Sequence, residues 1–203
     1  MNVFEKMFKQ NPSVVSYCKE YAKHVSELLV NLDFQAINQV FEVLLNAREN
    51  GNTIIFVGNG GSAATCSHFA EDLSFGTIVP GKKTFRTLSL TDNVSYITAL
   101  ANDEGYKNIF VGQLKNLFNP GDVVIGISAS GNSQNVIKAL EYANNNGGIS
   151  IGLVGFDGGK IKNICKYIIH VKTTKGEYGP VEDIHLALDH MISTYVKFHL
   201  LNE

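Results

Sequence analysis

The sequence has no surplus of charge of either sign and no long hydrophobic run. Its 17 Lys and Arg residues against 19 Asp and Glu residues give a formal net charge of −2. Binding to nucleic acid needs a clustered basic surface, so this balance argues against a nucleic-acid partner. No apolar run approaches the roughly 20 residues that span a bilayer, and the opening segment MNVFEKMFKQNPSVV lacks the apolar core of a signal peptide. We therefore expect no membrane partner either.

Cysteine is also scarce. Cys18, Cys66 and Cys165 are odd in number and widely spaced, without a CxxC pair, which fits reduced thiols in the cytoplasm. The sequence contains no linker, repeat or low-complexity segment. A length of 203 residues with 44% hydrophobic residues is ordinary for one globular domain. We expect residues 1–203 to form a single domain, with 1–50 as a helical N-terminal extension.

Short apolar runs alternate with helical segments along the chain. The predicted strands are 53–57, 84–90, 122–127, 149–154 and 167–171. The predicted helices are 14–28, 34–47 with Asp33 as N-cap, 63–73, 134–145 and 181–200. Unbroken apolar strands that alternate with helices are typical of a parallel sheet covered on both faces. The predicted fold class is therefore α/β, with ligands bound at the carboxyl ends of the strands.

The first loop at such a strand end is rich in glycine. Gly58-x-Gly60-x-x-Ala63 fits the letters of a dinucleotide fingerprint, but the acidic residue expected about 20 positions later is missing. No Gly-Lys-Ser/Thr follows, so the loop is not a Walker A motif either. We expect no nucleotide cofactor. Glycines with a purely structural role remain an alternative at this point.

The second loop, Ser128-Ala-Ser-Gly-Asn-Ser133, carries three hydroxyl groups between a strand and a helix. Hydroxyls and backbone amides can surround a phosphate without a lysine. A single loop of this kind can also be an N-cap with turn chemistry. Two such loops on one parallel sheet predict a small phosphorylated ligand.

Three strings of residues resemble a known family. Val57-Gly-Asn-Gly-Gly-Ser-Ala63, Ile127-Ser-Ala-Ser-Gly-Asn-Ser133 and Ala101-Asn-Asp103 are similar to the sugar isomerase (SIS) domain, and within it to the phosphoheptose isomerases. The resemblance extends over almost the whole chain. It implies a five-stranded flavodoxin-like sheet and a homotetramer with active sites at subunit interfaces. It also implies substrate contacts from Asn59, Gly60, Gly61, Ser62, Asn102, Asp103, Ser128, Ala129, Ser130, Ser133 and Glu182.

Titratable residues gather on two predicted helices. His68 and Asp72 lie four residues apart and share a helix face, a spacing that suits a divalent metal, an acid–base pair or a simple surface ion pair. The last helix carries Glu182, Asp183, His185, Asp189 and His190. Its spacing alone predicts an amphipathic core helix, with inward residues Ile184, Leu188, Met191, Ile192 and Tyr195.

The resemblance implies one zinc ion per subunit and a set of catalytic residues. The family's zinc ligands map to His68, Asp72, Glu182 and His190, and its catalytic residues to Asp72 and His190. Two positions depart from the family: Asp72 replaces Glu, and Glu182 replaces Gln. Since Asp72 is shorter by one methylene group, our hypothesis is a relocated carboxylate, with Glu182 as a further catalytic residue. Glu182 as a stronger zinc ligand is the alternative.

The implied activity is conversion of sedoheptulose 7-phosphate to D-glycero-manno-heptose 7-phosphate through an enediol, within carbohydrate metabolism and heptose biosynthesis. Segment 175–180 also departs from the family pattern, which leaves the sugar itself open. Isomerisation of another ketose phosphate is one alternative. A non-catalytic SIS module that binds a phosphosugar or a protein is another, although such relatives tend to have lost the histidines that this chain keeps.

Overall fold

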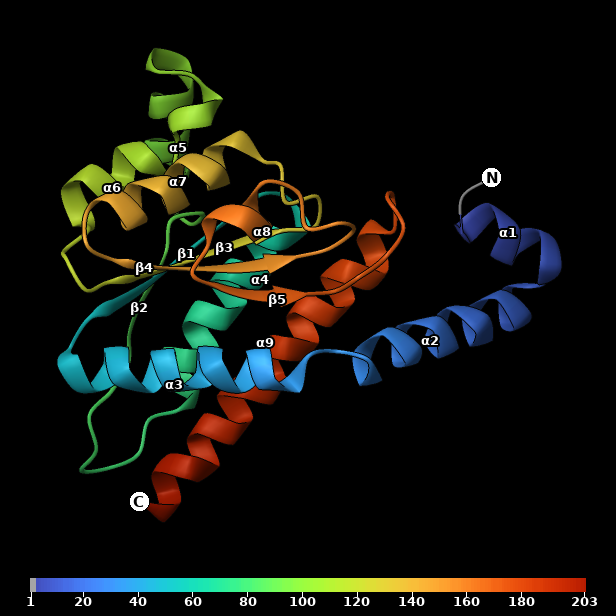
Figure 1. Ribbon diagram of the computed structural model, residues 1–203, viewed down its shortest axis with the longest axis horizontal. Helices are drawn as coiled ribbons and strands as arrows, with labels where there is room; N and C mark the ends of the chain where they lie inside the picture. Colours follow the sequence, from blue (N-terminus) through green and yellow to red (C-terminus); the bar gives the residue numbers. More distant parts are fainter. Residues whose placement is uncertain (1–2) are drawn as a thin grey trace.

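A computed structural model describes residues 3–203 and shows five parallel strands in the order β2-β1-β3-β4-β5 (Figure 1). The strands are β1 (Thr53–Gly58), β2 (Arg86–Ser89), β3 (Val123–Ser128), β4 (Ile149–Val154) and β5 (Tyr167–His170). All five were predicted, within a few residues at their ends. The central strands are apolar and buried because helices cover both of their faces. The α/β fold class is confirmed.

Helices form a layer on each face of the sheet (Figure 1). One face carries α3 (Phe34–Asn50), α4 (Gly61–Glu71) and α9 (Tyr178–Asn202). The other carries α5 (Val94–Asp103), α6 (Val111–Leu117), α7 (Gln134–Asn145), α8 (Ile161–Ile164) and the short 3-10 helix η2 (Tyr106–Asn108). Each layer encloses its own hydrophobic cluster against the sheet.

The strand order places a crossover point between β1 and β3. In a sheet with this order the connections after these two strands leave toward opposite faces, and ligands bind in the crevice between them. The strands pair in register from Ile54↔Val123 to Gly58↔Ile127, so the loops that follow them begin side by side. Buried Asp122 fixes the start of β3, because its carboxylate accepts the backbone N–H groups of Thr53 and Asn119, each at 2.8 Å. Because β1 and β3 pair in register up to their carboxyl ends, the glycine-rich loop after β1 and the serine-rich loop after β3 meet at the carboxyl edge of the sheet.

The first two helices, α1 (Val3–Gln10) and α2 (Val14–Val30), form an arm that projects from the rest of the molecule, with Leu28 and Leu29 at the inner end of α2 packed against the core (Figure 1). None of the residues of α2 is buried, and α1 lies at its outer end. Two polar contacts tie α2 to the region of α9: Tyr21 donates to Asp183 at 2.6 Å, and His24 lies 2.6 Å from Glu177. Asp33 is the N-cap of α3, as predicted, since its carboxylate accepts the N–H groups of Gln35 and Ala36.

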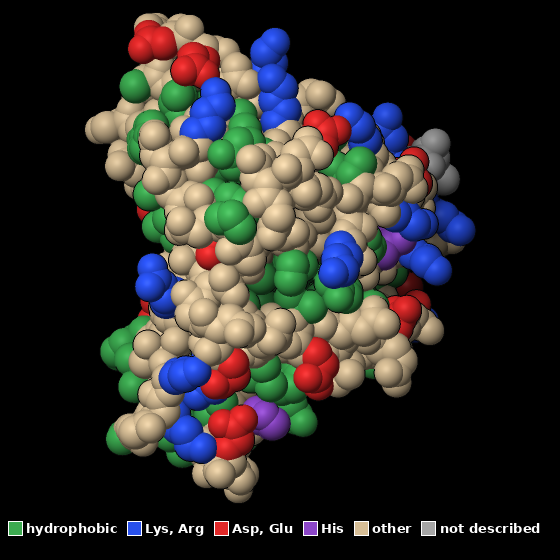
Figure 2. Space-filling model, turned by 60° about the vertical axis from the view of Figure 1, so that its left-hand side comes forward, with side chains coloured by type: hydrophobic (Ala, Val, Ile, Leu, Met, Phe, Trp, Pro, Cys, Tyr) green, Lys and Arg blue, Asp and Glu red, His purple; other side chains and the backbone are tan. Residues whose placement is uncertain are grey.

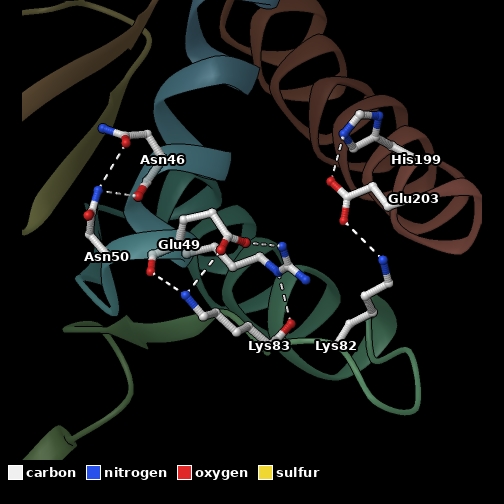
Figure 3. Close-up of polar contacts among 8 residues, drawn as sticks. Asn46, Glu49, Asn50, Lys82, Lys83, His199 and Glu203 are labelled. Atoms are coloured by element: carbon white, nitrogen blue, oxygen red, sulfur yellow. Dashed lines mark hydrogen bonds and ion pairs between the residues drawn. The ribbon is translucent and has the colours of Figure 1, made fainter.

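The C-terminal end of α9 is tied by ion pairs to the connection between α4 and β2 (Figure 3), away from the arm (Figure 1). Lys83 binds the Glu49 carboxylate at 3.1 Å and holds the connection between α4 and β2 to the end of α3. Lys82 lies 3.5 Å from Glu203, which also pairs with His199 at 3.2 Å.

One prediction about α9 is wrong: Met191 and Tyr195 are exposed rather than inward, although Ile184, Leu188 and Ile192 are buried.

The surface shows no large area of one charge on the face drawn in Figure 2, where Lys and Arg are interspersed with Asp and Glu. The three cysteines are free. No single helix among residues 3–203 is long and apolar enough to cross a membrane. Only α2 and α3 taken together, across a bend of 67°, meet such a test by length and composition.

Candidate active site

The carboxyl ends of β1 and β3 are each followed by a helix whose N-cap residue makes no side-chain hydrogen bond to it. Helix α4 begins after Gly60, whose φ of 55° is a conformation that glycine adopts without strain, and α7 begins after Ser133. Gly60 has no side chain to cap α4, and the Ser133 side chain accepts no hydrogen bond from α7. In α7 the N–H of Val136 is taken by the Asn135 side chain, so the N–H groups of the first two residues of each helix are the ones available, and the helix dipoles favour an anion there.

The loop after β3, which we call the serine loop (128–133), is held in one conformation. Ser128 and Ser133 lie 3.1 Å apart through their hydroxyl oxygens, and the N–H of Asn132 donates to the Ser130 hydroxyl at 3.3 Å. A side chain at Gly131 would overlap with the backbone of Gly158, so the loop packs closely on the turn after β4. Ser128 and Ala129 are buried, and Ser130 and Ser133 are partly exposed. The hydroxyls thus converge at the uncapped end of α7.

A pair of asparagines joins the two loops. Asn59 and Asn135 exchange two side-chain hydrogen bonds, of 3.0 and 2.8 Å, and the Tyr106 hydroxyl also donates to Asn59 at 2.8 Å. Asn59 was expected to contact substrate, and its side-chain oxygen is already engaged by these two donors. Asn135 and Tyr106 were missed in the sequence, where only the position of Asn135 in the first turn after the serine loop gives any signal.

A hollow of about 230 Å³ adjoins the serine loop. Its lining residues are Ser130, Asn132, Phe156, Asp157, Thr173 and Lys175. Lys175 belongs to the segment that departs from the family pattern. It brings a positive charge to the lining of the hollow, and Asp157 brings a negative one. The predicted substrate residues Asn102 and Asp103 lie exposed at the end of α5, joined by a hydrogen bond of 2.7 Å.

The carboxylate of Glu182, on α9, lies against Gly61 at the start of α4. A side chain added at Gly61 would overlap with this carboxylate, so Glu182 could keep its position only with glycine there. The next residue, Ser62, is buried in the first turn. Burial, and to a lesser extent the neighbouring charge of Asp183, raises the pKa of the partly buried Glu182 carboxyl. Its position places a carboxylate beside the first loop.

Two helical turns further along, α4 and α9 bring four ligand-type side chains together. His68, Asp72, Asp189 and His190 each offer one atom, and these atoms all lie within 4.8 Å of one another. His68 Nε2 is 3.6 Å from an Asp72 oxygen, and the rings of His68 and His190 are 5.1 Å apart. Asp72 opens a π-helical segment, η1 (Asp72–Gly76), a deviation that often marks functional sites.

This group of four, which we call the His–Asp cluster, fits a divalent cation. Asp189 is fully buried, and neither of its carboxylate oxygens has a hydrogen-bond partner. Burial, together with the charges of Asp72 and Glu71, raises the pKa of Asp189 to about 8. A cation among these groups would offset that cost, and two imidazoles with two carboxylates suit zinc.

The cluster differs from the ligand set expected from the sequence. It contains the predicted His68, Asp72 and His190, and the fourth member is Asp189 rather than Glu182. Asp189 was not predicted to bind metal, and the signal that was available is its charge on the otherwise apolar inner face of the last helix.

The chain is similar to known proteins in sequence and in fold. Residues 16–155 match the family model described as the SIS domain. The chain is 40% identical over 163 residues to the phosphoheptose isomerase of Aneurinibacillus thermoaerophilus, covering 79% of this chain and 80% of that one. It is 35% identical over 178 residues to the probable phosphoheptose isomerase of Thermoplasma acidophilum, covering 88% and 96% respectively.

A solved structure shares the fold over nearly the whole chain. The phosphoheptose isomerase GmhA from Neisseria gonorrhoeae superposes with a TM-score of 0.82 at 29% identity, covering 91% of this chain and 97% of that one. The similarity seen in the three sequence strings is thus confirmed over the sheet and both helical layers.

Proposed function

From the premise that this chain belongs to the SIS domain family, and within it to the phosphoheptose isomerases, we propose its reaction and its site. The protein is an isomerase that interconverts sedoheptulose 7-phosphate and D-glycero-manno-heptose 7-phosphate. The observation that carries this proposal is the meeting, at one edge of the sheet, of an anion site with titratable side chains. The anion site comprises the serine loop and two uncapped helix ends.

The phosphate of the substrate would bind at the serine loop. Ser128, Ser130 and Ser133 supply hydroxyl donors, and the first N–H groups of α7 supply backbone donors. Lys175 adds a positive charge at the neighbouring hollow. The sugar chain would then extend past Gly60 and Gly61, with its carbonyl end toward Glu182.

The reaction moves protons between neighbouring carbons and oxygens. A base takes a proton from C1 of the ketose. The electron pair of that bond forms the C1–C2 double bond of the enediol, and the π pair of the C2 carbonyl moves to O2. Return of a proton to C2, with transfer of the O1 proton to O2, leaves the aldose. We assign the base to Glu182 and the oxygen-to-oxygen transfer to His190. Because these two residues lie about 12 Å apart along α9, the imidazole that serves the same substrate would be His190 of the partner subunit, while Asp72 faces His68 within the His–Asp cluster.

We further propose that the His–Asp cluster holds one zinc ion per subunit, with His68, Asp72 and His190 as ligands. Zinc, when bound, polarises oxygen atoms of a substrate. Each imidazole has two ring nitrogens, so His190 can face the cluster with one and exchange a proton through the other. His68 is 45% exposed, which leaves the cluster open to a substrate.

The assignment of Glu182 is tested by Glu182→Gln, which keeps the size of the side chain and removes its basicity. We expect kcat to fall by about 10²-fold or more, because a positioned general base contributes roughly 10²–10⁴-fold. Steady-state kinetics with sedoheptulose 7-phosphate measure the effect, and Glu42→Gln, the same change at an exposed position of α3, is the matched control.

Activity that is unchanged or improved in Glu182→Gln would overturn the relocated carboxylate. In that case Asp72→Asn, with its metal content measured in parallel, becomes the test of the alternative base. Loss of activity in Asp72→Asn at full metal content would give the role to Asp72.

We also propose that the protein acts in the cytoplasm as a homotetramer with active sites at subunit interfaces. Apolar side chains on α2 and α9 are exposed, among them Val14, Val15, Tyr195 and Phe198. A groove of about 330 Å³ between α3 and α9 is lined mainly by apolar residues, including Phe34 and Met191. A second copy of the chain would cover these surfaces, because contiguous exposed apolar area marks interaction sites.

A further inference from the structure

We propose that Asp189 is a direct ligand of the divalent cation held by His68, Asp72 and His190, in the place that the family resemblance gives to Glu182. The inference rests on the metal site of the proposed function and changes its composition. It gives the cation two imidazole nitrogens and two carboxylates, all contributed by α4, the start of η1 and α9.

The geometry brings Asp189 to the cluster. Its ligand oxygen, the Asp72 oxygen and one ring nitrogen each of His68 and His190 all lie within 4.8 Å of one another. The separation of 3.6 Å between His68 and Asp72 is already close to the roughly 3.3–3.5 Å that separates two ligands of one tetrahedral zinc ion. Modest side-chain movement is therefore enough to enclose a cation.

The surroundings of Asp189 require a partner that the protein does not supply. Its neighbours on the inner face of α9, Leu188 and Ile192, are apolar and buried. His185, one turn earlier, also has no hydrogen-bond partner at either ring nitrogen, so the two side chains do not pair with each other. Buried carboxylates are found paired or bound to metals, and no protein donor serves this one among residues 3–203.

Glu182 is a poorer fourth ligand in this structure. It lies seven residues before Asp189 on the same helix, a distance of about 10 Å along the axis at 1.5 Å per residue. Its carboxylate is directed at Gly61, at the beginning of α4, whereas His68 lies two turns further on. With Asp189 as the ligand, Glu182 remains free to contact the sugar.

The position of Asp189 also compensates for the shorter side chain at residue 72. An aspartate at 72 reaches less far into the space between α4 and α9 than the glutamate of the family. Asp189 enters the same space from the opposite helix. The shortened carboxylate and the additional one thus form a single arrangement across the two helices.

The test is metal affinity measured on the purified full-length chain. Metal-free wild type, Asp189→Asn, Glu182→Gln and the control Glu71→Gln are titrated with Zn²⁺ by calorimetry, and with Co²⁺ by visible absorption, which reports the ligand geometry. Glu71 is exposed and adds negative charge near the cluster without belonging to it. Asp189→Leu is a second variant, because an apolar residue at a buried ionic site is expected to fold well.

We expect Asp189→Asn and Asp189→Leu to bind Zn²⁺ about 100-fold more weakly and to change the Co²⁺ spectrum, a loss at the upper end of that seen for metal-site partners. Glu182→Gln and Glu71→Gln should stay within about threefold of wild type. Equal affinity in wild type and both Asp189 variants would overturn the ligand assignment alone. Absence of metal binding in an active wild type would overturn the metal site and leave the isomerase intact.

Discussion

His185 is fully buried on α9, and both of its ring nitrogens lack a hydrogen-bond partner. Burial lowers its pKa to about 4 from the usual 6.5. The backbone of Val154 acts in the opposite direction and has the smaller effect on this pKa. Below pH 6.5 the unfolded chain therefore binds a proton at this position that the folded chain does not. His185 therefore leaves the free energy of unfolding nearly unchanged above pH 6.5 and lowers it progressively as the pH falls from 6.5 toward 4.

Replacement of His185 by leucine removes this proton-linked loss. Between pH 7 and pH 4 we expect the free energy of unfolding of wild type to fall by about 3 kcal/mol more than that of His185→Leu, from a shift of about 2.5 pKa units. Urea unfolding at pH 7, 5.5 and 4.5 measures the difference. Parallel stability curves for the two proteins would contradict the neutral, buried state of His185.

At the scale of elements, two residues at helix starts have opposite roles. Asp33 caps α3 through two hydrogen bonds from backbone N–H groups, whereas Ser133 precedes α7 and makes no such bond. Asp33→Ala should lower the free energy of unfolding by about 1 kcal/mol, the usual cost of a lost N-cap, and leave kinetics unchanged.

Ser133→Ala should do the reverse, with little effect on stability and an increase in KM of about tenfold, since one hydrogen bond to a charged group contributes roughly 1.5 kcal/mol or more. Thermal unfolding and steady-state kinetics on both variants check the pair. A stability loss in Ser133→Ala as large as that in Asp33→Ala would show that the serine loop supports the fold rather than the substrate.

The sequence predicted all five strands and the long amphipathic helices but missed several of the other helices. Strands β1, β3, β4 and β5 show as apolar runs, and α7 and α9 are long enough to display a helical period. Helix α5 buries none of its residues and α8 has only four residues, so neither shows a periodic apolar face. The π-helical turn at Asp72 also has no sequence signature, because it departs from the period on which such predictions rest.

The candidate site was predictable where local chemistry defines it. Glycines and serines at strand ends identified both loops, and the spacing of His68 and Asp72 identified one side of the His–Asp cluster. Asn135 and Asp189 were missed because their partners come from other elements, 76 residues away in the case of Asn59. The spacing of residues on one helix does not show what the facing helix contributes.

At the scale of the whole molecule, most of the exposed large apolar side chains lie on the arm and on the helical layer of α3 and α9. Tyr195 was expected to point inward, and it is 60% exposed, with its ring 5.1 Å from that of Phe41. The apolar stripe of α9 is therefore wider than one core contact needs. A helix with apolar residues on two sides is typical of an element that packs against the sheet and against a second subunit.

This surface gives a test of assembly. Tyr195→Asp places a charge in the groove between α3 and α9 and should convert the proposed tetramer, four copies of the 22.2 kDa chain, into smaller species. Light scattering after size exclusion measures the mass, with Leu117→Asp on the opposite helical layer as the exposed control. An unchanged mass for Tyr195→Asp would exclude this groove from the interface.

The central claim is that the chain isomerises a heptose phosphate through an enediol, and proton NMR in D₂O tests it most directly. The protein is incubated with sedoheptulose 7-phosphate, with and without zinc, beside a His190→Ala variant. We predict new anomeric signals of the aldose, with deuterium at C2, and their absence in the variant. A spectrum that keeps only the ketose signals under both conditions, with properly folded protein, would contradict the account.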